Sequence, residues 1–154
     1  MAILFDDTAD AYSGNNIGYN MWIGGQQVTK YVANGQTLTQ ANGNTAIIST
    51  GTYKVDYDAA GNIISMTQVV YGTTPGFVTL AASYCDGTVI RNDTASTASA
   101  YYCSGMNIYI VHSVSKTVTA GTTADVANAT TPVNNYMVLN AAGQVTTTFV
   151  VVAD

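Results

Sequence analysis

Short β-prone runs separated by Gly and Asn turns constrain the fold of this chain more than any other feature. Val, Ile, Thr and Tyr alternate with polar residues over about four to eight positions, a period typical of half-buried strands. Gly24-Gly25 lies between two such runs and predicts a two-residue hairpin turn. The predicted strands cover residues 2–5, 21–23, 26–32, 36–40, 45–50, 52–57, 63–71, 76–84, 88–91, 100–103, 107–119, 133–139 and 145–152.

This spacing predicts an all-β fold. Strands that recur about every 8–12 residues, with turns between them, are typical of an antiparallel β-sandwich or jelly roll, here with about 8–12 short strands. Within residues 120–130 we expect at most one helical turn. A length of 154 residues suits one domain. We therefore predict an N-terminal arm over residues 1–13 and a single β-sandwich domain over residues 14–154.

Charged side chains are scarce, at 8% of the residues against about 25% in an average soluble domain. Four Lys and Arg residues and a net charge of −5 argue against nucleic acid as a partner, because phosphate backbones are bound by clustered cations. No apolar run approaches the ~20 residues that span a bilayer, so we expect no membrane insertion. Sheet edges are ordinarily protected by Lys, Pro and inward-pointing charges. Here either the edges close on themselves or other subunits cover them, and we expect the second.

Two segments repeat one local pattern of strand, Asx-Ala-Ala-Gly turn and strand. The turns cover residues 58–61 and 140–143. In each, the Asx side chain can bond the backbone ahead of it, and Gly supplies the positive φ that closes the turn. The two copies either mark a duplicated half or are two hairpins that use the same favourable turn. Residues 57–63 also resemble one unit of the YD-repeat family of large β-shells, which implies a hairpin and nothing more.

The N-terminus begins with an apolar strand formed by Ala2, Ile3, Leu4 and Phe5. A polar stretch without apolar periodicity follows over residues 6–16. A β-prone end on such a tether suits strand addition to a neighbouring subunit's sheet, so these four residues are a candidate donor strand. The alternative is an ordinary first strand in the chain's own sheet. The start has neither a basic nor a long apolar segment, so we expect no export signal.

Cys85 and Cys103 are the only cysteines. They are a candidate disulfide, which would stabilise the fold by about 3 kcal/mol in the chain-entropy model. The alternative is two buried free thiols. Two cysteines and one histidine cannot supply the four ligands of a structural zinc site.

Residues that catalysis would need are present but poorly arranged. In an alternating strand, His112 faces away from Ser113 and Ser115, so a nucleophile–base pair is not expected. Asp56 and Asp58 share one face of a strand and are the best carboxylate pair, but adjacent acids in a strand usually form a solvated edge. We therefore predict that the protein is not an enzyme.

Two ligand sites remain as hypotheses. Asp6, Asp7 and Asp10 cluster beside Asn residues and are candidate ligands of a structural calcium ion, although their spacing differs from the EF-hand loop. No other cofactor is expected. Trp22, Tyr19 and Tyr31 are candidates for stacking against a glycan, because aromatic faces and neighbouring amides suit sugars. Sequons at Asn92 and Asn128 matter only in a secreted protein.

These features predict a structural subunit of a large assembly that contacts copies of itself or other subunits. In its few charges, its many Thr, Asn and Gly residues and its alternating pattern, the chain resembles surface and decoration proteins of tailed-phage virions. That resemblance implies a capsid decoration, tail or fibre protein at the virion surface. One alternative is an extracellular filament or pilus subunit joined by donor-strand complementation. Another is a carbohydrate-binding β-sandwich module that recognises cell-surface glycans.

Overall fold

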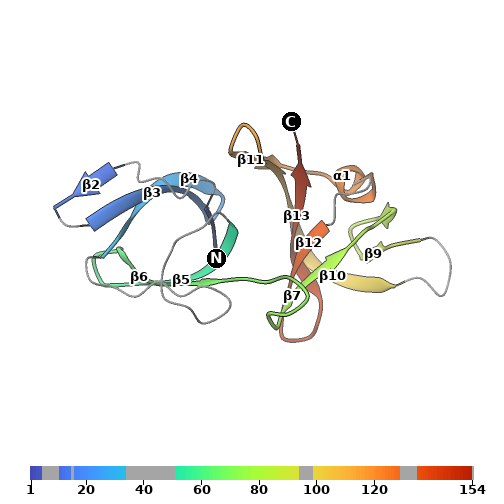
Figure 1. Ribbon diagram of the computed structural model, residues 1–154. Coiled ribbons are helices and arrows are strands. Elements are labelled where there is room, and N and C mark those ends of the chain that lie inside the picture. The colour runs from blue at the N-terminus through green and yellow to red at the C-terminus, as the bar shows by residue number, and fades with distance from the viewer. Residues whose placement is uncertain (5–10, 15, 34–50, 94–98, 129–134, 154) are drawn as a thin grey trace. The chain divides into compact units, whose positions relative to one another are not determined.

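The computed structural model describes residues 1–4, 11–14, 16–33, 51–93, 99–128 and 135–153 (Figure 1). Within these ranges the chain forms thirteen strands and one five-residue helix, α1 (Thr123–Ala127). The all-β class is therefore confirmed, and the strands form two sheets. The strand count slightly exceeds the expected number because several strands have only two or three residues. The predicted strands at 36–40 and 45–50 lie outside the described residues.

The chain divides into two compact units, Met1–Val70 and Tyr71–Asp154, here called the first and second units. This boundary differs from the predicted one after residue 13, because the predicted arm contributes two strands to the first unit's own sheet. The first unit contains β1 (Ala2–Leu4), β2 (Ala11–Ser13), β3 (Asn16–Ile23), β4 (Gln26–Val32), β5 (Gly51–Tyr57) and β6 (Ile63–Gln68). Its sheet has the order β1-β5-β6-β4-β3-β2.

The second unit has one more strand than the first. It contains β7 (Phe77–Leu80), β8 (Tyr84–Cys85), β9 (Val89–Arg91), β10 (Ala100–His112), β11 (Thr117–Ala120), β12 (Asn135–Leu139) and β13 (Val145–Val152). Its sheet has the order β7-β12-β13-β10-β9-β8, and β11 pairs with β10. The predicted strands 100–103 and 107–119 form the continuous strand β10 followed by a hairpin, because the chain bulges at Gly105 (φ +58°) without losing its pairing to β13.

The two units share one topology. β1 to β4 correspond in order to β7 to β10, and β5 and β6 correspond to β12 and β13. Every corresponding pair has the same direction: β4 and β6 run parallel, as do β10 and β13, and the other four shared pairs are antiparallel. Such agreement favours the interpretation that the protein contains a duplicated half.

The repeated Asx-Ala-Ala-Gly turns occupy the same place in both units. One joins β5 to β6 and the other joins β12 to β13. The Asp58 carboxylate accepts the Ala60 and Asn62 N–H groups at 2.9 and 2.8 Å. The Asn140 side-chain oxygen accepts the Ala142 and Gln144 N–H groups at 2.9 and 3.0 Å. The shared architecture therefore extends to individual hydrogen bonds.

A bulge follows each turn at the same position. In the first unit the β5–β6 register skips Ile64, between the partners of Asp56 and Tyr57. In the second unit the β12–β13 register skips Thr146, between the partners of Val138 and Leu139. A bulge increases the local twist of a hairpin, so both hairpins are more strongly twisted at the position next to the turn.

The units differ in how their sheets end. In the first unit β1 pairs with β3 as well as with β5, so five strands close into a ring. In the second unit, within the described residues, no pairing joins β7 to β9 and the sheet stays open. β3 has eight residues, so two strands can pair one after the other along the same edge of it. β9 has only three residues, and β8 already pairs with the corresponding edge.

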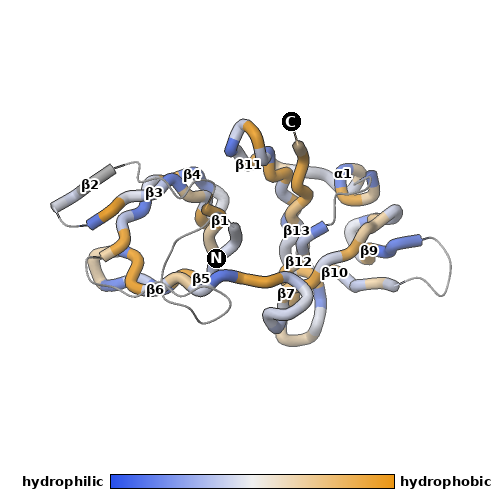
Figure 2. Tube along the Cα trace, in the orientation of Figure 1, coloured by the Kyte–Doolittle hydropathy of each residue, from blue (hydrophilic) through white to orange (hydrophobic). Residues whose placement is uncertain are grey.

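Each unit has its own hydrophobic core. The first core contains seven buried residues: Ala2, Leu4, Met21, Val32, Tyr53, Ile63 and Met66. The second contains six: Ala82, Ile90, Val126, Met137, Val145 and Val150. Figure 2 shows the run of hydrophobic residues along β13 that supplies part of the second core.

The short helix is held by a capping box and by a buried amide. The Thr122 hydroxyl accepts the Asp125 N–H, and the Asp125 carboxylate accepts the Thr122 N–H at 2.7 Å. The buried Asn135 donates through Nδ2 to the carbonyl oxygens of Val126 and Leu80. These contacts hold α1 so that Val126 packs in the second core.

Candidate functional site

The residues considered for a catalytic triad have other partners. The Nε2 of His112 lies 3.0 Å from the Oγ1 of Thr119, a diagonal neighbour on β11. Ser113 donates its hydroxyl proton to the Val152 carbonyl at 2.8 Å. The structure therefore turns the Ser113 hydroxyl toward β13 and gives His112 a threonine as its cross-strand partner.

Asp56 and Asp58, the candidate carboxylate pair, form hydrogen bonds within their own hairpin. Asp56 accepts a hydrogen bond from the Ser65 hydroxyl across β5 and β6 at 2.8 Å. Asp58 builds the turn, and the Asn62 side chain that donates to it lowers the pKa of its carboxyl group, with the backbone N–H of Asn62 contributing further. A glycosidase acid needs a raised pKa, so the direction at Asp58 is opposite to that role.

Asp86 has the most strongly lowered pKa of the carboxyl groups in the described residues, and it was not predicted as a site from the sequence. The side chain and backbone N–H of Thr88 lower the pKa of Asp86, and the Val89 N–H and the Tyr84 hydroxyl add to the effect. The Asp-Gly dipeptide at 86–87 is the signal that predicts such a turn. Since every bond closes the β8–β9 hairpin, the role of Asp86 is structural.

The two cysteines are free thiols in this structure. Both are half-buried and pack against the second core, and burial raises the pKa of Cys103 to about 11. Cys85 lies opposite Ile90, which in turn lies opposite Tyr101 on β10. β9 therefore lies between β8 and β10, yet the two thiols are near enough that the charge of Cys85 also raises the pKa of Cys103. The candidate disulfide stays a prediction.

The three aromatic residues proposed for glycan stacking do not share an open face. Trp22 is only 6% exposed and lies opposite Ile3 in the β1–β3 pair. Tyr19 packs against the first core, on the other face of β3. Tyr31 is half-buried, and its ring lies so close to Gly18 that a Cβ there would come within 2.9 Å of it.

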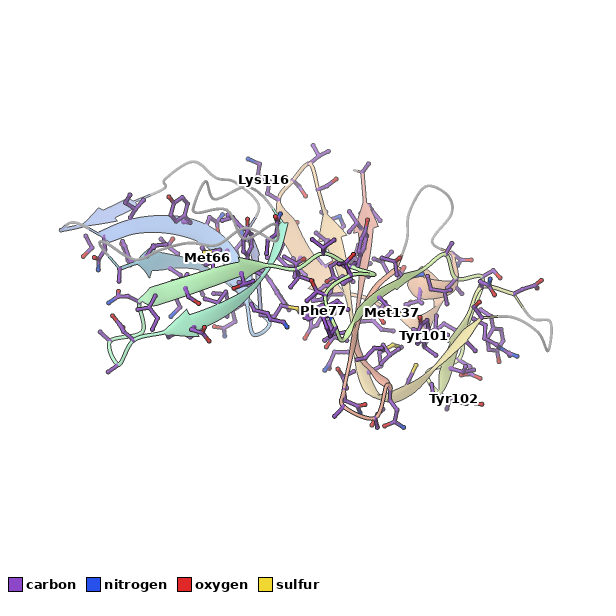
Figure 3. The ribbon with its side chains drawn as sticks, turned by 60° about the horizontal axis from the view of Figure 1, so that its bottom comes forward. Met66, Phe77, Tyr101, Tyr102, Lys116 and Met137 are labelled. Carbon is purple, nitrogen blue, oxygen red and sulfur yellow. The ribbon has the colours of Figure 1, made fainter. Side chains whose placement is uncertain are left out.

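Among the described residues, the most exposed aromatic side chain is that of Tyr102 on β10, with 71% of its surface accessible (Figure 3). Its neighbour Tyr101 packs instead against the second core. On the adjoining strands the Arg91 guanidinium lies 4.4 Å from the centroid of the Tyr84 ring. Alternation places Tyr84, Arg91 and Tyr102 on the same outer face of the sheet.

The candidate donor strand is an internal strand of its own sheet. β1 is hydrogen bonded to β3 on one side and to β5 on the other. Phe5 and the candidate calcium ligands Asp6, Asp7 and Asp10 lie outside the described residues, so those parts of the hypotheses stay predictions. Where side chains are described, no group of three His, Cys, Asp or Glu residues could hold a metal ion.

Sheet edges in the second unit are the remaining candidate site. β7, β8 and β11 end the sheet or its branches, and none of the three contains a charged residue. The outer edge of β7 is partly covered by its own turn, because Phe77 donates to the Thr74 carbonyl and accepts from the Gly72 N–H. β8 has only two residues. The four-residue strand β11 therefore offers the longer uncovered edge.

Comparisons with known proteins do not assign the chain to a family. No family model, curated protein or solved structure matches the chain. Across the described ranges, no helix has the length and hydrophobicity needed to cross a bilayer. The site to be explained is therefore the uncharged edge of the second unit and the exposed outer face beside it.

Proposed function

We propose that this protein is a non-enzymatic structural subunit of a large assembly, in which the second unit makes the contacts. The observation that carries the proposal is the contrast between the units: the first closes five of its six strands into a ring and leaves β2 at an edge, whereas the second ends in β7, β8 and β11 without a charged residue. Open edges without charges or prolines are ready to pair with another chain. Low charge supports the same function, because little electrostatic repulsion separates copies at a net charge of −5.

The assembly that we favour is a tailed-phage virion, with the chain at the virion surface as a decoration, tail or fibre protein. The support for this choice is the compositional resemblance described above. Its partners would be copies of itself or other virion subunits. Mass spectrometry of gradient-purified phage particles that carry this gene should detect the chain at stoichiometric level, and its absence from such particles would contradict the virion assignment.

Assembly itself is tested by sedimentation velocity and native mass spectrometry on the purified chain across a wide concentration range. We expect the weight-average mass to rise with concentration. A strict monomer at every concentration, together with no binding to particles, would overturn the proposed function. The donor-strand alternative is weaker, since β1 already has partners on both sides and its release would open the first unit's ring.

One observation favours carbohydrate binding as a second candidate function. Tyr102 is exposed on an outer face that also holds Arg91 and Tyr84, a combination that suits stacking and hydrogen bonding to a sugar. Glycan-array binding should then fall on Tyr102→Ala and persist on Tyr57→Ala, where Lys30 lies 5.4 Å from the ring centroid of another exposed tyrosine. Equal behaviour of the two variants would remove this candidate.

A further inference from the structure

The free edge of β11 has a defined set of hydrogen-bonding groups. On its paired side, β11 matches Thr117 with His112 and Thr119 with Ile110, and the Gly121 N–H donates to the Ile108 carbonyl at 2.9 Å. Hydrogen-bonded pairs alternate along an antiparallel ladder. Val118 and Ala120 therefore direct their N–H and C=O groups away from β10. Across the part of the chain that the structure describes, no strand pairs with that side.

We propose that a second copy of this chain pairs its own β11 with this edge, antiparallel and about a twofold axis at Thr119. In this register Val118 lies opposite the partner's Ala120, and Ala120 lies opposite the partner's Val118. Both outward-facing residues of each copy are then used, which makes four backbone hydrogen bonds. Registers centred on Val118 or on Ala120 would leave one of the two residues without a counterpart.

The side chains of this segment suit pairing with an identical strand. Thr117, Val118, Thr119 and Ala120 carry no charge that would face its own copy across the axis. The same register places Lys116, in the turn before β11 (Figure 3), opposite the partner's Thr122. The carboxylate of Asp125 is bound to the N–H and the hydroxyl of Thr122, both at 2.7 Å. In the proposed dimer a cation of each copy therefore lies toward the segment that holds the other copy's Asp125, and twofold symmetry repeats this arrangement.

This inference rests on the proposed function and deepens it by naming the partner and the contact. A twofold contact closes after two copies, so it forms a dimeric building block rather than an endless filament. The segment that carries it, β11, extends the sheet beyond the six strands that the two units share. In the first unit, residues 34–50 of the segment between β4 and β5 lie outside the described residues.

Ala120→Pro is the most selective substitution. The Ala120 N–H faces the open edge, so proline there removes an intermolecular donor and leaves the bonds between β10 and β11 in place. Two donors are lost per dimer, and we expect the dissociation constant to rise at least about tenfold. Ala120→Ser keeps the N–H and should dimerise like the unmodified chain. Equal dissociation constants for the two variants, with circular dichroism confirming that both are folded, would overturn the proposal.

Crosslinking tests the register independently. Thr119 would face the partner's Thr119 at a non-hydrogen-bonded position, where Cα atoms lie about 4.5 Å apart and a disulfide can form. Under mild oxidation Thr119→Cys should yield a covalent dimer. Val114→Cys is the control, since Val114 is 68% exposed on the same hairpin but lies away from the axis. Equal crosslinking of both variants, or none at Thr119→Cys, would contradict the pairing.

The two proposals fail in different ways. If the chain forms oligomers or binds particles but Ala120→Pro leaves both unchanged, the β11 contact is wrong and the structural-subunit function stands. If the chain is a monomer at every concentration and binds no particle, both are wrong.

Discussion

The two units of this protein have the same strand order, but they differ in whether the sheet closes into a ring. The first closes its sheet by pairing β1 with β3, and the second leaves the corresponding strands β7 and β9 apart. The difference comes from strand length. β3 is long enough for residues 16–18 to pair with β2 and for residues 21–23 to pair with β1. β9 ends at Arg91, and its residues on this edge already pair with β8, so β9 has no further residues that could pair with β7.

This contrast shows that a shortage of charge does not dictate how edges are protected. The first unit protects five of its six strands by closure and leaves the three-residue strand β2 at an edge. The second relies on short strands and on the turn that folds back over Phe77. Surfaces for other subunits are therefore expected on the second unit, although the amino-acid composition alone does not separate the two halves.

The largest expected effect tests whether the units are separate in stability as well as in topology. Leu4→Ala removes a side chain that is 1% exposed in the closing strand and should lower the free energy of unfolding of the first unit by about 2–5 kcal/mol. Trp22, the only tryptophan, reports on that unit in a urea titration. Met137→Ala is the matched change in the second core, and amide exchange of β13 follows it. Equal shifts of both probes by either substitution would show that the units unfold as one.

A smaller effect tests the equivalence of the two turns. Gly61 and Gly143 have φ values of +83° and +76°, and each closes its turn with a hydrogen bond to the Asx carbonyl. Alanine at either position should cost about 1–2 kcal/mol, because an L-residue is strained in this region. A Cβ meets nothing within 4 Å at Gly143 and only the Lys30 Nζ at 3.9 Å at Gly61, so the costs should be similar. Thermal unfolding of both variants measures them, and clearly unequal losses would break the equivalence.

The smallest effect separates the turns by charge. Hydrogen bonds from the Asn62 side chain and backbone lower the pKa of Asp58 below 3.8, whereas Asn140 has no such charge. The lowered folded-state pKa means that the stabilisation is complete above about pH 4 and is lost as the pH falls through the lowered pKa. In an NMR titration the Ala60 amide should shift with acid and the Ala142 amide should not. Asp58→Asn should abolish the shift at Ala60, and a persistent shift would assign it to another group.

Local features of the fold were predictable from the sequence. The Gly24-Gly25 hairpin, both Asx turns, the helical turn within residues 120–130 and the strand at 145–152 all depend on neighbouring residues, and the structure confirms them. The all-β class follows from the same alternation. The hydrogen-bonding role of Asp86 was missed although Asp-Gly is a strong turn signal, because the flanking strands β8 and β9 have only two and three residues and give little alternation to read.

Long-range features were not predictable. The parallel pairs β4–β6 and β10–β13 join segments far apart in the chain, and no local residue pattern specifies them. The shared topology was also hidden, since corresponding core positions hold different residues. Tyr53 pairs with β1 where Asn135 pairs with β7, and only the two turns retain a common sequence. Among the candidate sites, the buried position of Trp22 likewise depends on a long-range pairing, that of β3 with β1.

The parallel seam of the first unit has a consequence for its motions. One residue pair, Val32 with Ile63, and one further bond from the Ala33 N–H to the Ile63 carbonyl join β4 to β6, whereas seven pairs join β10 to β13. Transient opening of the ring should therefore begin between β4 and β6. The free energy of this local opening should be well below the free energy of global unfolding. The Ala33 amide proton would then exchange with solvent before the amides of the other strand pairs. The first unit, although its strands form a ring, would open locally between β4 and β6.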